Sequence, residues 1–459
     1  MFSLLLSMAV VTNIFYIFAL MKLPAIKGFN EEAFNKYLKN TGWLMFGRIL
    51  SMLVGFVVAR FLGPVSFGDL SFADAFTAIA AAIGALGLDT FIIREIINDP
   101  SKKDEILGTS LFLRLGINLL LIPISIGLYL LFHHLSDNPG APLTYVVILL
   151  SFAAFFKSFN VIDSYFQSQV QSKYVVQVQN ICVILSALIK IVLVLLHLPV
   201  IWFAWALVFD GFILAFGLML MYRIKGFDMS KWHFKKSRAK SLLKQSAPLI
   251  LSAVMVSIYM KIDQVMLKTE GSKAVGIYAA VAKISEAWYF IPVAIVTSVF
   301  PALILARETD HERYLKRLQN LYDLLVAISL PVAVVITFSS SLIINIIYEN
   351  RFEGAETMLP IHIWSGIFVF LGSASSQFLL AEGFTKISFY RTAFGALLNI
   401  LLNLWLIPLY AGVGASIATL IACASSAFYL LFIPKTRQQG IMMLKSLFLV
   451  TAFQKIFKR

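Results

Sequence analysis

The apolar residues of this chain gather in long runs separated by short polar segments. A run of about 20 apolar residues, rising 1.5 Å per residue in a helix, spans the roughly 30 Å hydrocarbon layer of a bilayer. The pattern therefore predicts an all-α polytopic membrane protein with about twelve transmembrane helices. The predicted spans are 41–62, 70–93, 106–131, 142–165, 174–196, 199–221, 246–267, 276–305, 319–348, 357–381, 384–408 and 411–433.

The first predicted turn is strongly marked. Leu62-Gly63-Pro64 ends the first span, because proline removes a backbone donor and glycine tolerates turn dihedrals. The apolar run 2–21 precedes this span, and it is either an additional helix or an upstream extension of a chain that starts at Met21.

The polar segment 222–245 is the longest between two spans, and it divides them into six and six. The predicted organisation is an N-terminal extension (1–28), a six-helix bundle (29–221), a basic cytoplasmic linker (222–245), a second six-helix bundle (246–434) and a basic tail (435–459). Within the tail, Ile441–Phe453 is apolar but too short to cross, so we expect it to lie in the membrane interface.

Composition agrees with a membrane protein and charge fixes the expected orientation. The chain is 59% hydrophobic, 14% charged and has a mean hydropathy of +0.85. Of its 38 Lys and Arg residues, 27 fall on alternate segments that share one side, and only Lys268, Lys273 and Arg351 fall on the other. The positive-inside rule then places both ends of the twelve-helix unit in the cytoplasm. The net charge of +14 is explained by this topology and by anionic lipid rather than by nucleic acid.

The residue types that usually form metal or catalytic sites show no such spacing. Cys182 and Cys423 both lie in apolar spans, and the six histidines have no HExxH-type arrangement. We therefore expect no catalytic residues, no metal site and no bound cofactor.

A weak internal repeat relates the two halves. Leu38–Gly42 is echoed by Leu243–Ala247, and Gly68 and Ala73 are echoed 208 residues later by Gly276 and Val281. Two parallel repeats around an axis along the membrane normal suggest a transporter in which one half rocks against the other. A generic twelve-helix bundle is the plainer alternative.

Several short motifs resemble one family of transporters. The first half contains Gly47-Arg48, VVARFLGP (57–64) and FGDL (67–70), and the second contains IDQVML (262–267), VGIYAA (275–280), ISEAWYFIP (284–292) and VFP (299–301). Together they resemble polysaccharide flippases of the Wzx type, in the multidrug/oligosaccharidyl-lipid/polysaccharide (MOP) exporter superfamily. The resemblance covers about 30–440. It implies two six-helix bundles around a central cavity, and movement of undecaprenyl-pyrophosphate-linked oligosaccharide across a bacterial inner membrane for O-antigen, capsule or exopolysaccharide synthesis.

Cations inside apolar spans are the candidate substrate contacts. A cation at mid-bilayer costs about 2.5–3.5 kcal/mol on insertion scales, so such residues usually face a bundle interior or a watery cavity. A cationic, hydrated lumen would suit a pyrophosphate and its sugars, because an arginine side chain can donate two parallel hydrogen bonds to one phosphate group. The residues expected to line it are Arg48, Arg60, Arg114, Lys190, Lys261, Lys283 and Arg391. An interhelical salt bridge is the alternative explanation for each of them. Arg60, Lys157 and Arg391 lie near span ends, where their side chains can also snorkel to the interface.

Acids inside the spans are candidates for charge pairing or ion coupling. These are Asp74, Asp210, Asp263 and Glu286, of which Glu286 stands three residues after Lys283 on the same helical face. A carboxylate near lysine in a low dielectric can change its protonation state, so proton or sodium coupling through Asp263 and Glu286 is a hypothesis.

Two other functions remain open. A membrane-embedded polysaccharide polymerase or glycosyltransferase resembles other such enzymes in having a large external loop, whereas the external loops here are short. A drug exporter of the same superfamily would need an apolar aromatic pocket. The expected partners are the lipid-linked oligosaccharide, membrane lipids, and possible polymerase and chain-length-regulator proteins.

Overall fold

The computed structural model describes residues 31–135 and 143–450, and within these ranges the chain is helical and contains no β-strand. Ten helical segments of the described chain are long and apolar enough to cross a membrane. The predicted all-α polytopic membrane architecture is therefore confirmed. The apolar run 2–21, the tip of the loop at 136–142 and residues 451–459 lie outside the described ranges.

Two of these ten segments contain a kink at a predicted boundary between spans. In α2 (Glu31–Gly84), Gly63 adopts φ 69° and ψ 172° directly before Pro64. In α15 (Thr385–Phe428), Ala411 adopts φ 46° and ψ −126°, three residues after Pro408. Each kinked helix covers two predicted spans. The count of twelve separate crossings remains a prediction.

Gly42–Gly276 forms one compact unit. After α2 its helices are α3 (Asp89–Asn98), η1 (Pro100–Lys102), α4 (Lys103–Leu135), α5 (Thr144–Phe156), η2 (Lys157–Asn160), α6 (Val161–Ser168), α7 (Ser172–Leu195), α8 (Val200–Ile224), η3 (Met229–Lys231), α9 (Lys236–Met266), η4 (Leu267–Glu270) and the start of α10 (Ser272–Glu286). The predicted span at 142–165 is thus two α-helices joined by a 3₁₀ turn. This unit contains the basic linker and α9, and the predicted division at 222–245 remains a prediction.

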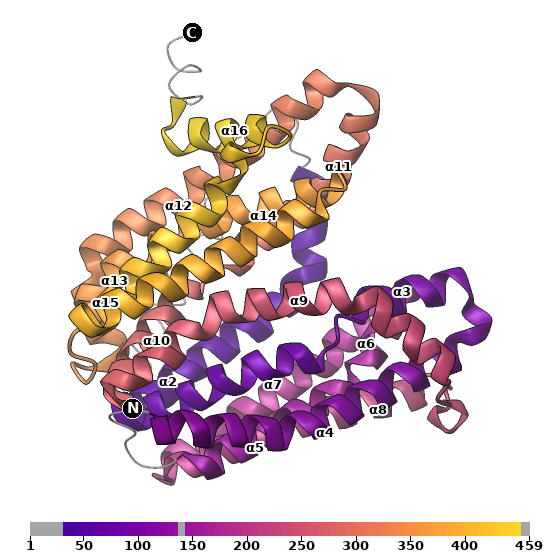
Figure 1. Ribbon diagram of the computed structural model, residues 1–459, viewed down its shortest axis with the longest axis horizontal. Helices are drawn as coiled ribbons and strands as arrows, with labels where there is room; N and C mark the ends of the chain where they lie inside the picture. Colours follow the sequence, from indigo (N-terminus) through magenta and orange to yellow (C-terminus); the bar gives the residue numbers. More distant parts are fainter. Residues whose placement is uncertain (1–30, 136–142, 451–459) are drawn as a thin grey trace. The chain divides into compact units, whose positions relative to one another are not determined.

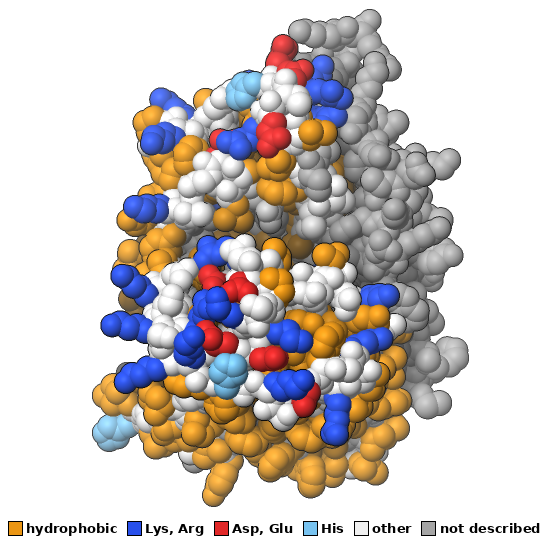
Figure 2. Space-filling view, turned by 90° about the vertical axis from the view of Figure 1, so that its right-hand side faces the viewer, with side chains coloured by type: hydrophobic (Ala, Val, Ile, Leu, Met, Phe, Trp, Pro, Cys, Tyr) orange, Lys and Arg blue, Asp and Glu red, His pale blue; other side chains and the backbone are white. Residues whose placement is uncertain are grey.

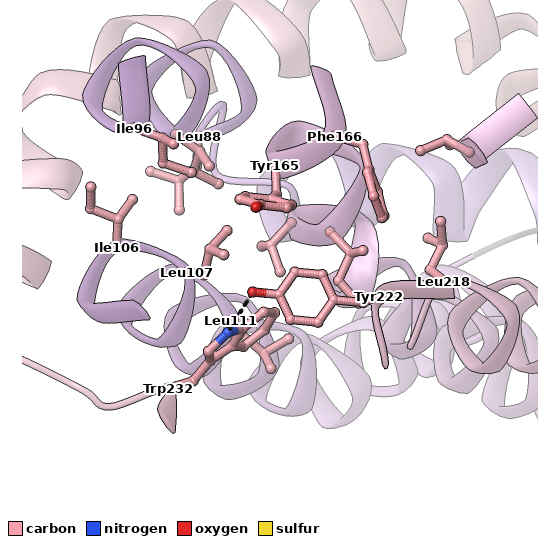
Figure 3. Close-up of a cluster of buried hydrophobic side chains, with 14 of the residues drawn as sticks. Leu88, Ile96, Ile106, Leu107, Leu111, Tyr165, Phe166, Leu218, Tyr222 and Trp232 are labelled. Carbon is pink, nitrogen blue, oxygen red and sulfur yellow. Dashed lines mark hydrogen bonds between the residues drawn. The ribbon is translucent and has the colours of Figure 1, made fainter. Parts of the chain in front are cut away.

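The basic linker is anchored in the core of this unit. Trp232 lies among buried side chains of α4, α6 and α8, and its indole N–H donates to the hydroxyl of Tyr222 at 3.3 Å (Figure 3). The backbone of His233 lies so close to Gly108 that a Cβ there would meet it. The backbone N–H and hydroxyl of Ser230 donate to Asp228 and hold the pKa of that carboxyl below its usual value. The linker is therefore ordered and packed against the helices of this unit.

The described residues from Ile277 onward belong to a second compact unit. Its helices are the rest of α10, α11 (Phe290–Thr309), α12 (His311–Tyr348), α13 (Ala355–His362), α14 (Ser365–Ala381), α15, η5 (Tyr429–Phe432) and α16 (Arg437–Leu447). In Figure 1, α12, α14 and α15 run alongside one another, and the short yellow helix α16 lies at one end of this unit.

Candidate transport site

Three of the predicted lumen cations form ion pairs inside the unit Gly42–Gly276. Each pair joins two different helices: Arg114 to Asp89, Lys190 to Asp210, and Lys261 to Asp74. These contacts place three of the predicted cations beside specific acids, and two of those acids, Asp74 and Asp210, were themselves predicted to pair or couple.

The Arg114–Asp89 pair is strongly asymmetric in burial. The Arg114 side chain on α4 is 2% exposed, whereas that of Asp89, at the start of α3, is 55% exposed. Arg114 Nη2 donates to Asp89 Oδ1 at 2.9 Å, and the hydroxyl of Ser164 on α6 donates to the same oxygen at 3.0 Å. Arg114 is thus enclosed, and it holds a partly open carboxylate in place.

Lys190 and Asp210 join α7 to α8 by a short contact. Lys190 Nζ lies 2.6 Å from Asp210 Oδ2 and 2.8 Å from the hydroxyl of Ser186 one turn earlier. Both helices otherwise expose large apolar side chains, such as Leu188 and Phe212. An ion pair between apolar helices neutralises two charges that hydrocarbon cannot hold, so here the salt-bridge alternative has direct support.

The Lys261–Asp74 pair is the loosest and most open of the three. Lys261 Nζ on α9 lies 3.7 Å from Asp74 Oδ2 on α2, with the side chains 31% and 54% exposed. At this separation the two charges attract but share no tight hydrogen bond. An anionic group could therefore approach Lys261 without first displacing a well-formed partner.

The remaining predicted residues of this unit have different surroundings. Arg48 on α2 is exposed, while Arg60, three turns further along the helix, is 8% exposed. Asp263 is 3% exposed, although Lys261 two residues before it is partly open. Two residues apart on a helix, Lys261 and Asp263 point in different directions, which agrees with this difference in burial.

In the second unit, Arg391 is satisfied by serines. It is 6% exposed and donates to the hydroxyls of Ser375 at 2.7 Å and Ser376 at 2.8 Å. Lys283 and Glu286 both lie half-buried on α10. Their predicted mutual pair remains a prediction, as does a lumen shared by all seven cations.

A charged cluster that the sequence analysis missed lies where α2 meets η4 and α10. Lys268, predicted to be an external loop residue, is 3% exposed and its Nζ lies 2.9 Å from Asp69 Oδ1. The Ser272 hydroxyl accepts from Lys268 at 2.5 Å and donates to Asp69 at 2.5 Å. Beside this cluster, the backbones of Gly68 and Gly276 approach so closely that a Cβ on either would overlap the other segment.

The internal repeat in the sequence could have indicated the position of this cluster. Gly68 and Gly276, the pair related by the 208-residue offset, are in contact in the structure. Lys268 follows Arg60 by the same offset, and both cations are buried. The repeat therefore marks a place where equivalent segments of the two predicted halves meet.

The second unit also contains buried polar groups that the sequence did not single out. The hydroxyl of Tyr278 lies 3.3 Å from His362 Nε2 and 3.0 Å from Thr419 Oγ1. On α15, Asn403 donates to Asn399 at 2.8 Å, and neither side chain is exposed. Each of these contacts gives a buried side chain at least one hydrogen-bond partner inside a helical bundle, where an unpaired group is costly.

Comparison with known proteins places this architecture in a family. Residues 37–305 match the family model described as polysaccharide biosynthesis protein, and residues 248–405 match the MatE family model. The uncharacterized membrane protein MJ1375 of Methanocaldococcus jannaschii is 28% identical over 221 residues, 46% of this chain and 52% of that protein, so the match spans about half the length of this relative.

Solved structures share the fold. The lipid II flippase MurJ in an inward closed conformation superposes with a TM-score of 0.70 at 18% identity, over 91% of this chain and 92% of that one. An inward-facing multidrug resistance MATE family transporter of the MOP superfamily superposes with a TM-score of 0.66 at 16% identity, over 89% and 96%. The chain belongs to the polysaccharide biosynthesis protein family.

Proposed function

We propose that this protein flips a lipid-linked oligosaccharide, with undecaprenyl pyrophosphate as the lipid carrier, from the cytoplasmic to the outer leaflet of a bacterial inner membrane. The observation that carries the proposal is the match of residues 37–305 to the polysaccharide biosynthesis family. The fold shared with a lipid II flippase is consistent with a lipid-linked substrate. Polysaccharide polymerase and chain-length regulator are the partners that such a pathway step implies.

The chemistry of the substrate explains why charged residues occur in apolar helices. A pyrophosphate and many sugar hydroxyls lose their hydration on entering a bilayer, at a cost of several kcal/mol for each unsatisfied polar group. Lys261 is partly exposed and only loosely held by Asp74, and Arg48 is exposed. These are the side chains best placed to exchange a water or a weak partner for a phosphate oxygen. Arg114 acts indirectly, by orienting Asp89.

Alternating access then requires the contact at Gly68 and Gly276 to open and close. Segments of the two predicted halves are in contact there, and the charged cluster of Asp69, Lys268 and Ser272 lies beside the two glycines. Outward movement of an anionic phosphate runs with an inside-negative potential, worth about 2.3 kcal/mol per charge per 100 mV. Asp263 and Glu286 are the proposed coupling residues if a proton or sodium gradient also contributes.

Reconstitution in liposomes tests the proposal. Undecaprenyl-pyrophosphate-linked oligosaccharide placed in one leaflet should become accessible to an external sugar-modifying enzyme only in vesicles that contain the protein. Lys261→Gln should slow flipping by about tenfold or more, since a charge-assisted contact contributes about 1.5–3 kcal/mol. Lys273→Gln, which removes an exposed cation, is the matched control. Wild-type protein that leaves the oligosaccharide in its original leaflet refutes the proposal.

A multidrug exporter is the second candidate, favoured by the MatE match at residues 248–405 and by the MATE-like fold. The same vesicles distinguish the two functions. A flippase moves the lipid-linked sugar and leaves a cationic dye such as ethidium where it was added, whereas an exporter moves the dye. Indifference of flipping both to membrane potential and to ion gradients would exclude the proposed driving forces but not the substrate.

A further inference from the structure

The helix α16 is attached to the second unit by polar side chains. The Gln439 side chain donates to the hydroxyl of Tyr322 on α12 at 2.5 Å, and both residues are buried. The Ser446 hydroxyl donates to Asp323 at 2.7 Å and accepts from Gln319 at 2.7 Å. The side of the helix that faces the protein thus carries polar side chains tied to α12, together with the buried Met443.

Apolar and cationic side chains occupy the opposite side of α16. Arg437, Ile441, Lys445 and Phe448 follow one another at helical spacing, and all four are exposed. Phe448 is 69% exposed and Ile441 is 42% exposed. Two large apolar side chains are thus exposed beside two cations, which is not expected of a helix that lies in water.

The charge on this outer side has one sign. Lys435, Arg437 and Lys445 are exposed, and no ion pair involves them in the described part of the chain. From Ile433 to Arg459 the sequence contains no Asp or Glu, and Lys455, Lys458 and Arg459 follow further along. Exposed apolar residues flanked by unpaired cations suit the boundary between acyl chains and anionic headgroups.

We propose that the outward face of α16, formed by Arg437, Gln438, Ile441, Lys445 and Phe448 with the adjoining Lys435, docks onto anionic phospholipids at the membrane surface. The bilayer is the partner of this face, and the contacts of Gln439 and Ser446 transmit the attachment to α12. The inference does not depend on which substrate is transported.

Lipid-specific fluorescence quenching on the full-length protein tests the docking. Gln438→Cys, in a background of Cys182→Ala and Cys423→Ala, carries an environment-sensitive dye on the outward face, and the protein is placed in nanodiscs of mixed phosphatidylcholine and phosphatidylglycerol. Spin-labelled phosphatidylglycerol should quench the dye severalfold more strongly than spin-labelled phosphatidylcholine at equal mole fraction. Combined Lys435→Gln, Arg437→Gln and Lys445→Gln should abolish this preference, at about fivefold in local lipid affinity per cation.

A matched variant distinguishes binding of anionic lipid at α16 from a general attraction of anionic lipid to the cations of the protein. Lys231→Gln, Lys236→Gln and Lys240→Gln remove three exposed cations from the linker and should leave the preference at position 438 intact. Equal quenching by both lipids, or an equal loss in the linker variant, overturns the proposal. A dye that neither lipid quenches also overturns it and indicates that water or a protein covers the face. If the triple variant of α16 does not fold, Arg437→Gln with Lys445→Gln gives the same comparison.

Discussion

At the residue scale, Gly68 has no room for a side chain. A Cβ there would overlap the carbonyl oxygen of Ser272 and press on the backbone N of Gly276. Backbone atoms cannot rotate away as a flexible side chain does, so the segments must separate. Gly68→Ala should therefore destabilise the protein by about 1–3 kcal/mol, as overpacking typically does. Denaturant-induced unfolding in detergent micelles measures the change.

Gly116→Ala is the control for this substitution. Gly116 lies within α4 and has no atom within 4 Å of an added Cβ. Alanine there should be neutral or stabilising by up to about 1 kcal/mol, because it reduces the entropy of the unfolded chain. Equal effects at both positions would show that the close approach of Gly68 and Gly276 does not exist in the folded protein.

The unequal burial of Arg114 and Asp89 predicts unequal costs of removing each. Asp89→Asn leaves an enclosed guanidinium without its counter-charge and should destabilise by about 3–5 kcal/mol. Arg114→Leu leaves an acid that is 55% exposed and can hydrate, so its cost should be nearer about 1 kcal/mol. Unfolding by SDS in mixed micelles gives both values. The double variant should resemble Arg114→Leu alone, and equal costs for the two single variants would contradict the asymmetry.

At the scale of elements, Glu105 fastens the basic linker to α4. Its two carboxylate oxygens accept from Lys235 at 2.9 Å and from Arg238 at 3.0 Å, and Arg238 also pairs with Glu95 on α3 at 2.8 Å. Figure 2 looks onto this end of the molecule and shows Lys and Arg interspersed with Asp and Glu. Glu105 therefore neutralises part of a dense basic segment and holds it against the helices.

Glu105→Gln should weaken the attachment of the basic linker to α4. Loss of two charge-assisted contacts, each contributing about 1.5–3 kcal/mol, should raise the rate of tryptic cleavage between Lys231 and Lys244 by at least about tenfold. Asp99→Asn is the control, because its pair with Lys102 is exposed on both sides and such pairs contribute about 0–1 kcal/mol. Unchanged cleavage in Glu105→Gln would mean that other contacts, such as those of Trp232 and the Arg238–Glu95 pair, hold the linker.

The sequence predicted the all-α membrane architecture but not which side chains pair between helices. Gly63-Pro64 marked the first kink, because proline and glycine act through local backbone constraints, and the second kink lies at the boundary predicted between the spans 384–408 and 411–433. The pairs Arg114–Asp89, Lys190–Asp210 and Lys261–Asp74 could not be assigned, since they depend on how two helices are rotated and registered against each other. Lys268 was missed because a lysine beside a short polar loop resembles a solvated residue, and its contacts with Asp69 and Ser272 are visible only in the structure.

At the scale of the whole molecule, opening of the charged cluster formed by Asp69, Lys268 and Ser272 should limit the rate of transport. If the two predicted halves must separate beside Gly68 and Gly276 in each cycle, a covalent link at this place stops the cycle in one state. Asp69→Cys with Ser272→Cys, in a background without Cys182 and Cys423, puts two thiols where an oxygen–oxygen contact of 2.5 Å now exists. Oxidation, or a short bifunctional thiol reagent, should abolish flipping in liposomes, and a reductant should restore it. Each single cysteine variant, treated in the same way, should retain the flipping rate it has before treatment. A cross-linked protein that still flips its substrate would place the moving contact elsewhere, since the fold alone does not determine which segments open.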